Sequence, residues 1–201
     1  MIKKVKVKKM KSDIILSGVG GQGILSIAAI IGLAAVENNL FIKQAEVHGM
    51  SQRGGDVQSH LRLSDNEISS DLIPYGRAGL ILSAEPMESL RYLPWLAEDG
   101  WLVTNSNPFI NIPDYPEISM VLGEIRKYKN NVIVDADKIA RGLGSIKVAN
   151  IIMLGAASPF IEIPYKSLEN SIRKLFGRKG EDVVQLNITA LASGREQVTA
   201  K

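Results

Sequence analysis

The sequence predicts an α/β protein with a Rossmann-like layered fold, a mainly parallel sheet and a helical C-terminal third. Three observations support this prediction. Short apolar runs alternate with stretches long enough for helices, which is the pattern of strands joined by crossover helices. A glycine-rich loop separates the first such run from the first such helix. From residue 147 onward the pattern is mostly helical.

The first third of the chain supplies three expected strands and one helix. Residues 13–17 form a short apolar run typical of a buried parallel strand. Residues 24–37 are apolar on nearly every side, which predicts a helix buried against a sheet. Residues 40–46 predict a second strand, and alternating apolar and polar residues over 57–63 predict a half-exposed third strand.

The middle of the chain continues the alternation. Residues 79–84 predict a buried strand, and Pro86 suits the first position of a helix that runs to about Asp99. Further strands are expected at residues 101–105 and 131–135. Each of these two strands is followed by an expected helix, near 117–127 and 136–144, and we expect Asp137 to cap the second. Three helices complete the pattern, at about 147–157, 166–176 and 181–194.

Charge divides the chain into a basic leader, residues 1–11, and a single domain, residues 12–201. The net charge is +3, but six lysines and no acid lie in the leader. The remainder carries 18 basic and 21 acidic residues, a net charge of −3. An acidic body with only 5% aromatic residues offers no stacking platform for nucleic acid, so we expect no nucleic-acid partner.

The chain contains no cysteine and only two histidines, His48 and His60. This composition excludes disulfides, cysteine nucleophiles and thiolate-bound zinc or iron–sulfur clusters on this chain, and we expect no metal site. The longest uncharged apolar run, residues 24–36, has 13 residues and falls short of the roughly 20 needed to span a bilayer. We therefore expect no membrane partner and a cytoplasmic protein without a secretory signal.

The first motif is Gly18-x-Gly20-x-x-Gly23 with an additional Gly21, between an expected strand and an expected helix. This context is typical of dinucleotide binding, since glycines let the backbone approach a ligand and the N–H groups of a helix start attract an anion. Glu46 follows Gly23 by 23 residues, near where a ribose-binding acid belongs. The alternative is that the glycines only permit close packing of helix on strand. A Walker-type loop is excluded, because no Gly-Lys-Ser/Thr follows.

The second motif is the polar loop that follows the second expected strand, where α/β proteins bind ligands. The Arg53 guanidinium suits a phosphate or carboxylate, because it donates two parallel hydrogen bonds. The alternative is a surface arginine beside a glycine turn. His48 lies in this loop without an identifiable carboxylate partner, and no catalytic residue can be assigned.

Together, residues 13–25 (DIILSGVGGQGIL) and 49–59 (GMSQRGGDVQS) resemble the γ-type subunit or domain of 2-oxoacid:ferredoxin oxidoreductases, especially the indolepyruvate branch. The resemblance continues through 150–156 and 187–194 and covers about residues 12–195. It implies a CoA-dependent oxidative decarboxylation of a 2-oxo acid, with ferredoxin as the electron acceptor. The alternatives are the γ subunit of a pyruvate or other 2-oxoacid enzyme, a free-standing dinucleotide-binding oxidoreductase, and a sensing or scaffolding module.

The resemblance also implies a division of labour. Thiamine diphosphate and iron–sulfur clusters belong to a cysteine-rich alpha subunit, ferredoxin is met through the complex, and this chain holds no cofactor and is inactive alone. Coenzyme A is the co-substrate. We hypothesise that the two loops form an anion-binding edge for CoA phosphates, or the rim of the partner's active site. The residues of this chain predicted to form that edge are Gly18, Gly20, Gly21, Gln22, Gly23, Ser51, Gln52, Arg53, Gly54 and Gly55.

Overall fold

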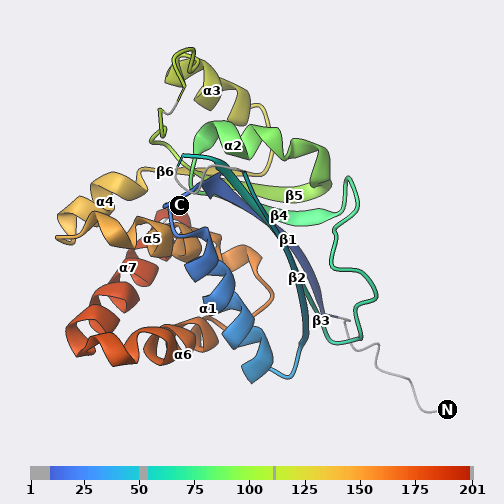
Figure 1. Ribbon diagram of the computed structural model, residues 1–201, viewed down its shortest axis with the longest axis vertical. Helices are drawn as coiled ribbons and strands as arrows, with labels where there is room; N and C mark the ends of the chain where they lie inside the picture. Colours follow the sequence, from blue (N-terminus) through green and yellow to red (C-terminus); the bar gives the residue numbers. More distant parts are fainter. Residues whose placement is uncertain (1–9, 50–53, 111, 200–201) are drawn as a thin grey trace.

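The computed structural model describes residues 10–49, 54–110 and 112–199, which form a six-stranded sheet covered by helices on both faces (Figure 1). The strand order is β2-β3-β1-β4-β5-β6. The strands are β1 (Lys11–Val19), β2 (Phe41–His48), β3 (Asp56–Ser64), β4 (Ala78–Ser83), β5 (Leu96–Asn105) and β6 (Asn131–Val134).

The sheet is mainly parallel, as the sequence predicts. The pairs β1–β4, β4–β5 and β5–β6 are parallel, whereas β3 is antiparallel to both β1 and β2. The prediction of a half-exposed third strand is wrong, because β3 lies between two strands and is covered on both faces. Leu61 packs in the main core, and His60, on the opposite face, is also buried.

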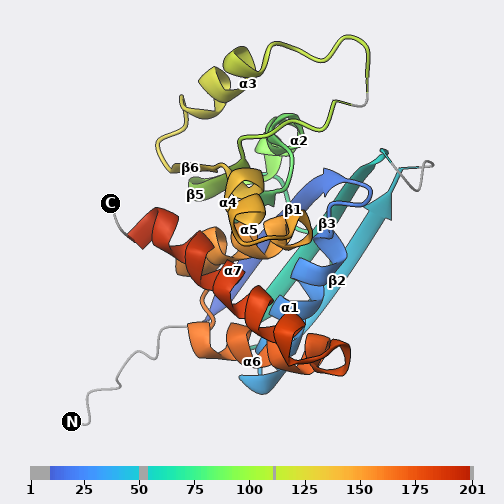
Figure 2. The same cartoon turned by 90° about the vertical axis from the view of Figure 1, so that its left-hand side faces the viewer.

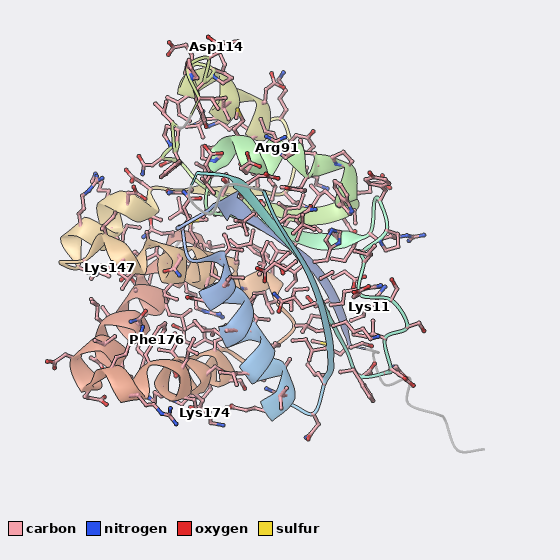
Figure 3. All side chains as sticks on the ribbon, in the orientation of Figure 1. Lys11, Arg91, Asp114, Lys147, Lys174 and Phe176 are labelled. Carbon is pink, nitrogen blue, oxygen red and sulfur yellow. The ribbon has the colours of Figure 1, made fainter. Side chains whose placement is uncertain are left out.

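The helices form two layers of unequal size, one on each face of the sheet (Figures 1 and 2). On one face lie α1 (Ile24–Glu37), α4 (Ala136–Gly142), α5 (Ala149–Ala157), α6 (Tyr165–Phe176) and α7 (Glu181–Thr199). On the other face lie α2 (Pro86–Arg91) and α3 (Ile118–Ile125). In Figure 3, Lys174 and Phe176 mark the α6 end of the larger layer, and Asp114 marks the opposite end of the molecule, beyond α2.

The larger layer holds the main core, in which α5 is the central helix. Residues 151–157 of α5 are all buried, between the sheet and α7. Side chains of β1, including Ile14 and Leu16, contribute the sheet side of this core. The smaller core on the other face gathers around Ile15, Ile81 and Ile125. The C-terminal third of the chain, predicted to be helical, therefore covers the main core.

Two local predictions need correction. The helix expected from Pro86 to about Asp99 ends at Arg91, because Pro94 has no N–H to donate and its ring clashes with the preceding turn. A short turn follows, and β5 already begins at Leu96. The cap of α4 is Asp135, whose side chain accepts a hydrogen bond from the Lys138 amide, and not Asp137.

Within the described part of the chain, the longest helices are too short or too polar to cross a lipid bilayer.

Candidate functional site

The first glycine loop lies at the carboxyl end of β1 and is held in shape by Gln22. The Gln22 Oε1 accepts a hydrogen bond from the Val19 amide at 2.8 Å, and its Nε2 donates to the Ala84 carbonyl at 3.3 Å. The loop is therefore fastened to its own strand and to the end of β4. Gly18 still belongs to β1, and a side chain there would come within 2.8 Å of Gln22 Oε1.

Gly23 starts helix α1 in the left-handed region, with φ of 78°. The Asn150 Nδ2 of α5 donates to the Gly23 carbonyl at 3.1 Å, and a Cβ on Gly23 would lie only 2.5 Å from that nitrogen. Glycine is needed here for both its backbone conformation and the close approach of Asn150. The starts of α1 and α5 consequently meet at one place.

The two loops predicted to share an edge of the sheet are adjacent. The Gly20 amide donates to the Gly55 carbonyl at 2.8 Å, which joins the two loops. The Gly49 amide donates to the Asp56 carbonyl at 2.9 Å, a bond within the second loop. Gly54, in a turn with φ of 80°, precedes this contact. Ser51, Gln52 and Arg53 lie outside the described residues, so their role stays a sequence prediction.

The strand order does not favour a dinucleotide at the glycine motif. In the dinucleotide fold, the strand that carries the ribose-binding acid lies beside the first strand. Here β3 separates β2 from β1, so Glu46 lies two strand spacings, about 10 Å, from β1. Asn150 also occupies the space beside the first turn of α1, where a pyrophosphate would bind.

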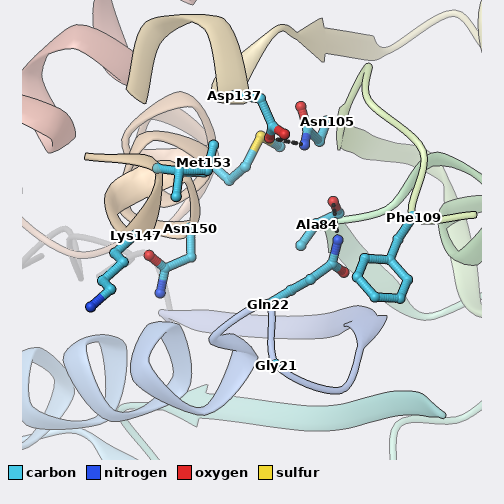
Figure 4. A pocket seen from close by; sticks show the side chains of 11 residues that line it. Gly21, Gln22, Ala84, Asn105, Phe109, Asp137, Lys147, Asn150 and Met153 are labelled. Atoms are coloured by element: carbon cyan, nitrogen blue, oxygen red, sulfur yellow. Dashed lines mark hydrogen bonds between the residues drawn. The ribbon is translucent and has the colours of Figure 1, made fainter. Parts of the chain in front are cut away.

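A cavity of about 290 Å³ opens at the carboxyl ends of the parallel strands (Figure 4). It lies between the first glycine loop and the start of α5. The residues that line it come from four regions of the chain: Gly21, Gln22, Ala84, Asn105, Phe109, Asp137, Ile146, Lys147, Ala149, Asn150 and Met153.

The cavity lining combines polar and apolar side chains. At the end of β5, Asn105 donates through Nδ2 to Asp137 Oδ1 at 3.0 Å, and its Oδ1 accepts from the Ala136 amide. The Phe109 ring lies across the cavity from Lys147 and Asn150 in Figure 4. Such a mixture of an aromatic ring, amides and charged groups is typical of a site for a polar organic ligand.

Lys147 supplies the positive charge of the cavity. It is exposed, and among the described residues no acidic group forms an ion pair with it. Asn150 Oδ1 is buried and accepts no hydrogen bond from a described residue. The negative charge of Asp137 is partly balanced by Arg141 at 3.9 Å. An anionic ligand is therefore best placed on the Lys147 side.

Sequence reasoning found the glycine loop but missed Asn105, Asp137, Lys147 and Asn150. Asn105 and Asp137 follow strands β5 and β6, and the rule that α/β proteins bind ligands at the carboxyl ends of strands could have found them. No local pattern marks Lys147, and Asn150 was noted only as the first residue of the stretch 150–156 that resembles the family, without a role. Only the packing of α5 against α1 brings the two residues to the cavity. The described residues form no cluster of three or more acidic or histidine side chains that could hold a metal ion.

Comparison with known proteins identifies the family of this chain. The family model described as pyruvate ferredoxin/flavodoxin oxidoreductase matches residues 13–197. The chain belongs to this family. Indolepyruvate oxidoreductase subunit IorB of Archaeoglobus fulgidus is 36% identical over 197 residues, which cover 94% of this chain and 96% of the relative.

Solved structures of 2-oxoacid oxidoreductases share the fold. The 2-oxoglutarate:ferredoxin oxidoreductase of Magnetococcus marinus, with 2-oxoglutarate, coenzyme A and succinyl-CoA bound, superimposes with a TM-score of 0.78 at 20% identity. The match covers 97% of this chain and 32% of that longer chain. Pyruvate oxidoreductase subunit PORC of Thermotoga maritima gives a TM-score of 0.71 at 23% identity and covers 94% of this chain and 97% of its own.

These relatives confirm the predicted class of activity. The protein is a subunit of a 2-oxoacid:ferredoxin oxidoreductase, and its fold is that of the γ subunits of these enzymes. Homologous chains work in complexes of several subunits, in agreement with the expectation of a partner.

Proposed function

We propose that this chain is the cofactor-free subunit of an indolepyruvate:ferredoxin oxidoreductase and that its cavity binds part of coenzyme A. The indolepyruvate branch is favoured by the 36% identity to a subunit of that name over nearly the full length of both chains. The CoA-bound state of the Magnetococcus marinus enzyme, which contains this fold, favours coenzyme A as the ligand.

The redox cofactors belong on the partner subunit in this proposal. An iron–sulfur cluster needs cysteine thiolates, and this chain has no cysteine. A magnesium ion for thiamine diphosphate needs several oxygen ligands, and the described carboxylates do not gather into such a group. The lack of cysteine and of a carboxylate cluster among the described residues therefore fits neither cofactor. We place both cofactors on a cysteine-rich alpha subunit that passes electrons to ferredoxin.

The observation that carries the CoA assignment is the exposed Lys147 beside the start of α5. Lysine is a common ligand of phosphate, and the N–H groups at a helix start add positive potential. The cavity volume of about 290 Å³ lies at the lower limit of ligand pockets, roughly 300–1,000 Å³. It can therefore enclose one end of coenzyme A, and the rest of the molecule would extend toward the partner's active site.

The charge of Lys147 provides the direct test. In the complex reconstituted with its alpha subunit, we expect Lys147→Ala to raise the KM for coenzyme A roughly tenfold, the loss of one charge-assisted hydrogen bond. The KM for the 2-oxo acid should not change. Lys129→Ala removes an exposed lysine outside the cavity lining and serves as the control. Equal KM values for coenzyme A in both variants would contradict the assignment.

The same complex decides the substrate branch. Ferredoxin reduction should be faster with indolepyruvate than with pyruvate at equal concentrations, and should require both coenzyme A and the partner. A preference for pyruvate would place the chain in the pyruvate branch instead. Tight NAD or FAD binding by the isolated chain would support a free-standing oxidoreductase and contradict the proposal.

A further inference from the structure

The segment between β5 and α3, residues 106–117, carries Phe109 to the cavity and is fastened at two points to one side chain. The Phe109 amide donates to Glu85 Oε1 at 3.4 Å. The Tyr115 hydroxyl donates to the same oxygen at 2.5 Å. Because these donors lie six residues apart, one carboxylate holds the segment at two separate points.

Glu85 is itself fixed in place. It directly follows Ala84, which lines the cavity and accepts the Gln22 hydrogen bond. Its second carboxylate oxygen accepts from the Glu88 amide at 2.7 Å and caps α2, and its backbone carbonyl accepts from the Ser83 hydroxyl at 2.6 Å. The link from Glu85 to the segment therefore relates Phe109 to the rigid end of β4.

The chemistry of Glu85 is unusual for a structural bridge. The residue is 1% exposed, and among the described residues the hydrogen-bond donors to its carboxylate are uncharged: two backbone amides and a phenol. Burial raises the pKa of Glu85, and the nearby Glu88 carboxylate adds to that rise. Burying a carboxyl group without a cation is unfavourable, so packing alone does not account for a glutamate at this position.

Phe109 is the residue that this link controls. The residue remains 42% exposed although it lines the cavity. A ring on a long connecting segment would otherwise sample many positions, and a ligand would have to order it on binding. Holding the segment in advance removes that cost and raises affinity.

We propose that Glu85 and Tyr115 are positioning residues that hold Phe109 against the cavity and thereby set its affinity for coenzyme A. The effect on affinity rests on the proposed CoA site. The hydrogen bonds that join the segment to Glu85 do not depend on that site. Glu85 and Tyr115 act through Phe109 and touch no reacting atom.

Tyr115→Phe gives the cleanest variant, because it removes one hydrogen bond and leaves the aromatic ring and the α2 cap in place. In the reconstituted complex we expect the KM for coenzyme A to rise roughly fivefold, the worth of one hydrogen bond, with kcat close to that of the wild type. Tyr128→Phe, at a tyrosine that follows α3 and lies outside the cavity lining, is the control and should leave both constants unchanged.

A double-mutant cycle tests whether the effect passes through Phe109. Phe109→Ala should raise the KM for coenzyme A by at least as much as Tyr115→Phe. In the Phe109→Ala background, Tyr115→Phe should add nothing, since the group it positions is gone. Independent, multiplicative effects of the two substitutions would overturn the proposal.

Hydrogen exchange of the isolated full chain separates this proposal from the CoA assignment. Tyr115→Phe should speed amide exchange within residues 106–117 and leave α5 unchanged; unchanged exchange in the segment overturns the link. If Lys147→Ala raises the KM for coenzyme A and Tyr115→Phe does not, the CoA site stands and the positioning role is overturned. If exchange speeds up and neither Lys147→Ala nor Phe109→Ala changes that KM, the CoA site fails, and the effect on affinity fails with it.

Discussion

At the scale of single residues, the stability of the fold depends on the protonation state of the His60 imidazole. The side chain is 4% exposed, and its Nδ1 accepts a hydrogen bond from the Ile73 amide at 3.0 Å. Burial lowers the pKa of His60; the charge of Arg62 acts in the same direction and that of Asp71 opposes it. The ring also meets Trp95 edge-on, at 5.9 Å between centroids. The folded state therefore favours the neutral imidazole.

The stability of the protein should consequently fall in mild acid. Because the unfolded chain binds the proton more readily, the contribution of His60 is present above pH 6.5 and is lost as the pH falls through that value toward the lower pKa of the folded state. His60→Asn offers an oxygen to the Ile73 amide and does not titrate. Urea unfolding across this pH range should show the wild type losing more stability than the variant, and parallel pH profiles would contradict the prediction.

The residues of the site differ in whether the sequence alone could predict them. The glycines at 18–23 and the second loop at 49–55 were singled out because glycine-rich turns leave a local pattern. The contact of Gly20 with Gly55 confirms that the loops meet, and of the predicted residues that the structure describes only Gly21 and Gln22 line the cavity. Phe109 and Glu85 were not assigned to the site, since their roles depend on contacts between distant segments. A phenylalanine in a loop and an acid after a strand have many ordinary explanations.

At the scale of elements, the crossing of α5 and α7 requires two glycines. A Cβ on Gly194 would lie 1.9 Å from the Ile152 carbonyl oxygen, and one on Gly155 would lie 2.1 Å from the Leu191 carbonyl oxygen. Backbone atoms cannot move aside as a side-chain end can. The two helices therefore pack at a distance that only glycine allows at both positions.

Gly194→Ala should lower the free energy of unfolding by about 3 kcal/mol, because the added methyl forces the helices apart in a closely packed core. Gly123→Ala, in α3, places its methyl in open space and should raise the free energy of unfolding by about 0.5–1 kcal/mol. Chemical denaturation of both variants compares the two effects. Equal effects would mean that the α5–α7 contact is loose.

Element boundaries were predictable where local chemistry sets them. Helix α1 was expected at residues 24–37 and spans Ile24–Glu37, between a glycine and two asparagines. The error at α2 has a local cause that was overlooked, Pro94. The error at β3 does not: its alternation is that of a half-exposed strand, and both faces are buried by segments distant in the chain, α1 on one face and residues around Ile73 and Trp95 on the other.

At the scale of the whole molecule, the order of the strands was beyond reach of the sequence pattern. Alternating strands and helices predicted a mainly parallel sheet, which is correct. That β3 inserts beside β1 depends on which of several pairings buries most apolar surface. This one insertion separates β2 from β1 and removes the geometry of a dinucleotide site, although the glycine motif in isolation favours one.

The two faces of the sheet should also differ in local stability. On the larger face, seven of the nine residues of α5 are buried, whereas on the smaller face α3 buries only Val121 and Ile125. Local opening is easiest where few apolar contacts hold an element. Native-state hydrogen exchange should therefore show amides of α3 opening at a lower free energy than those of α5, which should exchange only through global unfolding.

A pair of truncations makes this prediction quantitative. Ile152→Ala in α5 should lower the free energy of global unfolding by about 2–5 kcal/mol and with it the protection of α5 amides, but should leave the protection of α3 unchanged, because α5 stays packed when α3 opens. Ile125→Ala should lower the protection of both helices, because its contacts are lost in the local opening of α3 as well as in global unfolding. If Ile152→Ala lowers the protection of α3 together with that of α5, α3 does not open separately and the two layers unfold as one unit.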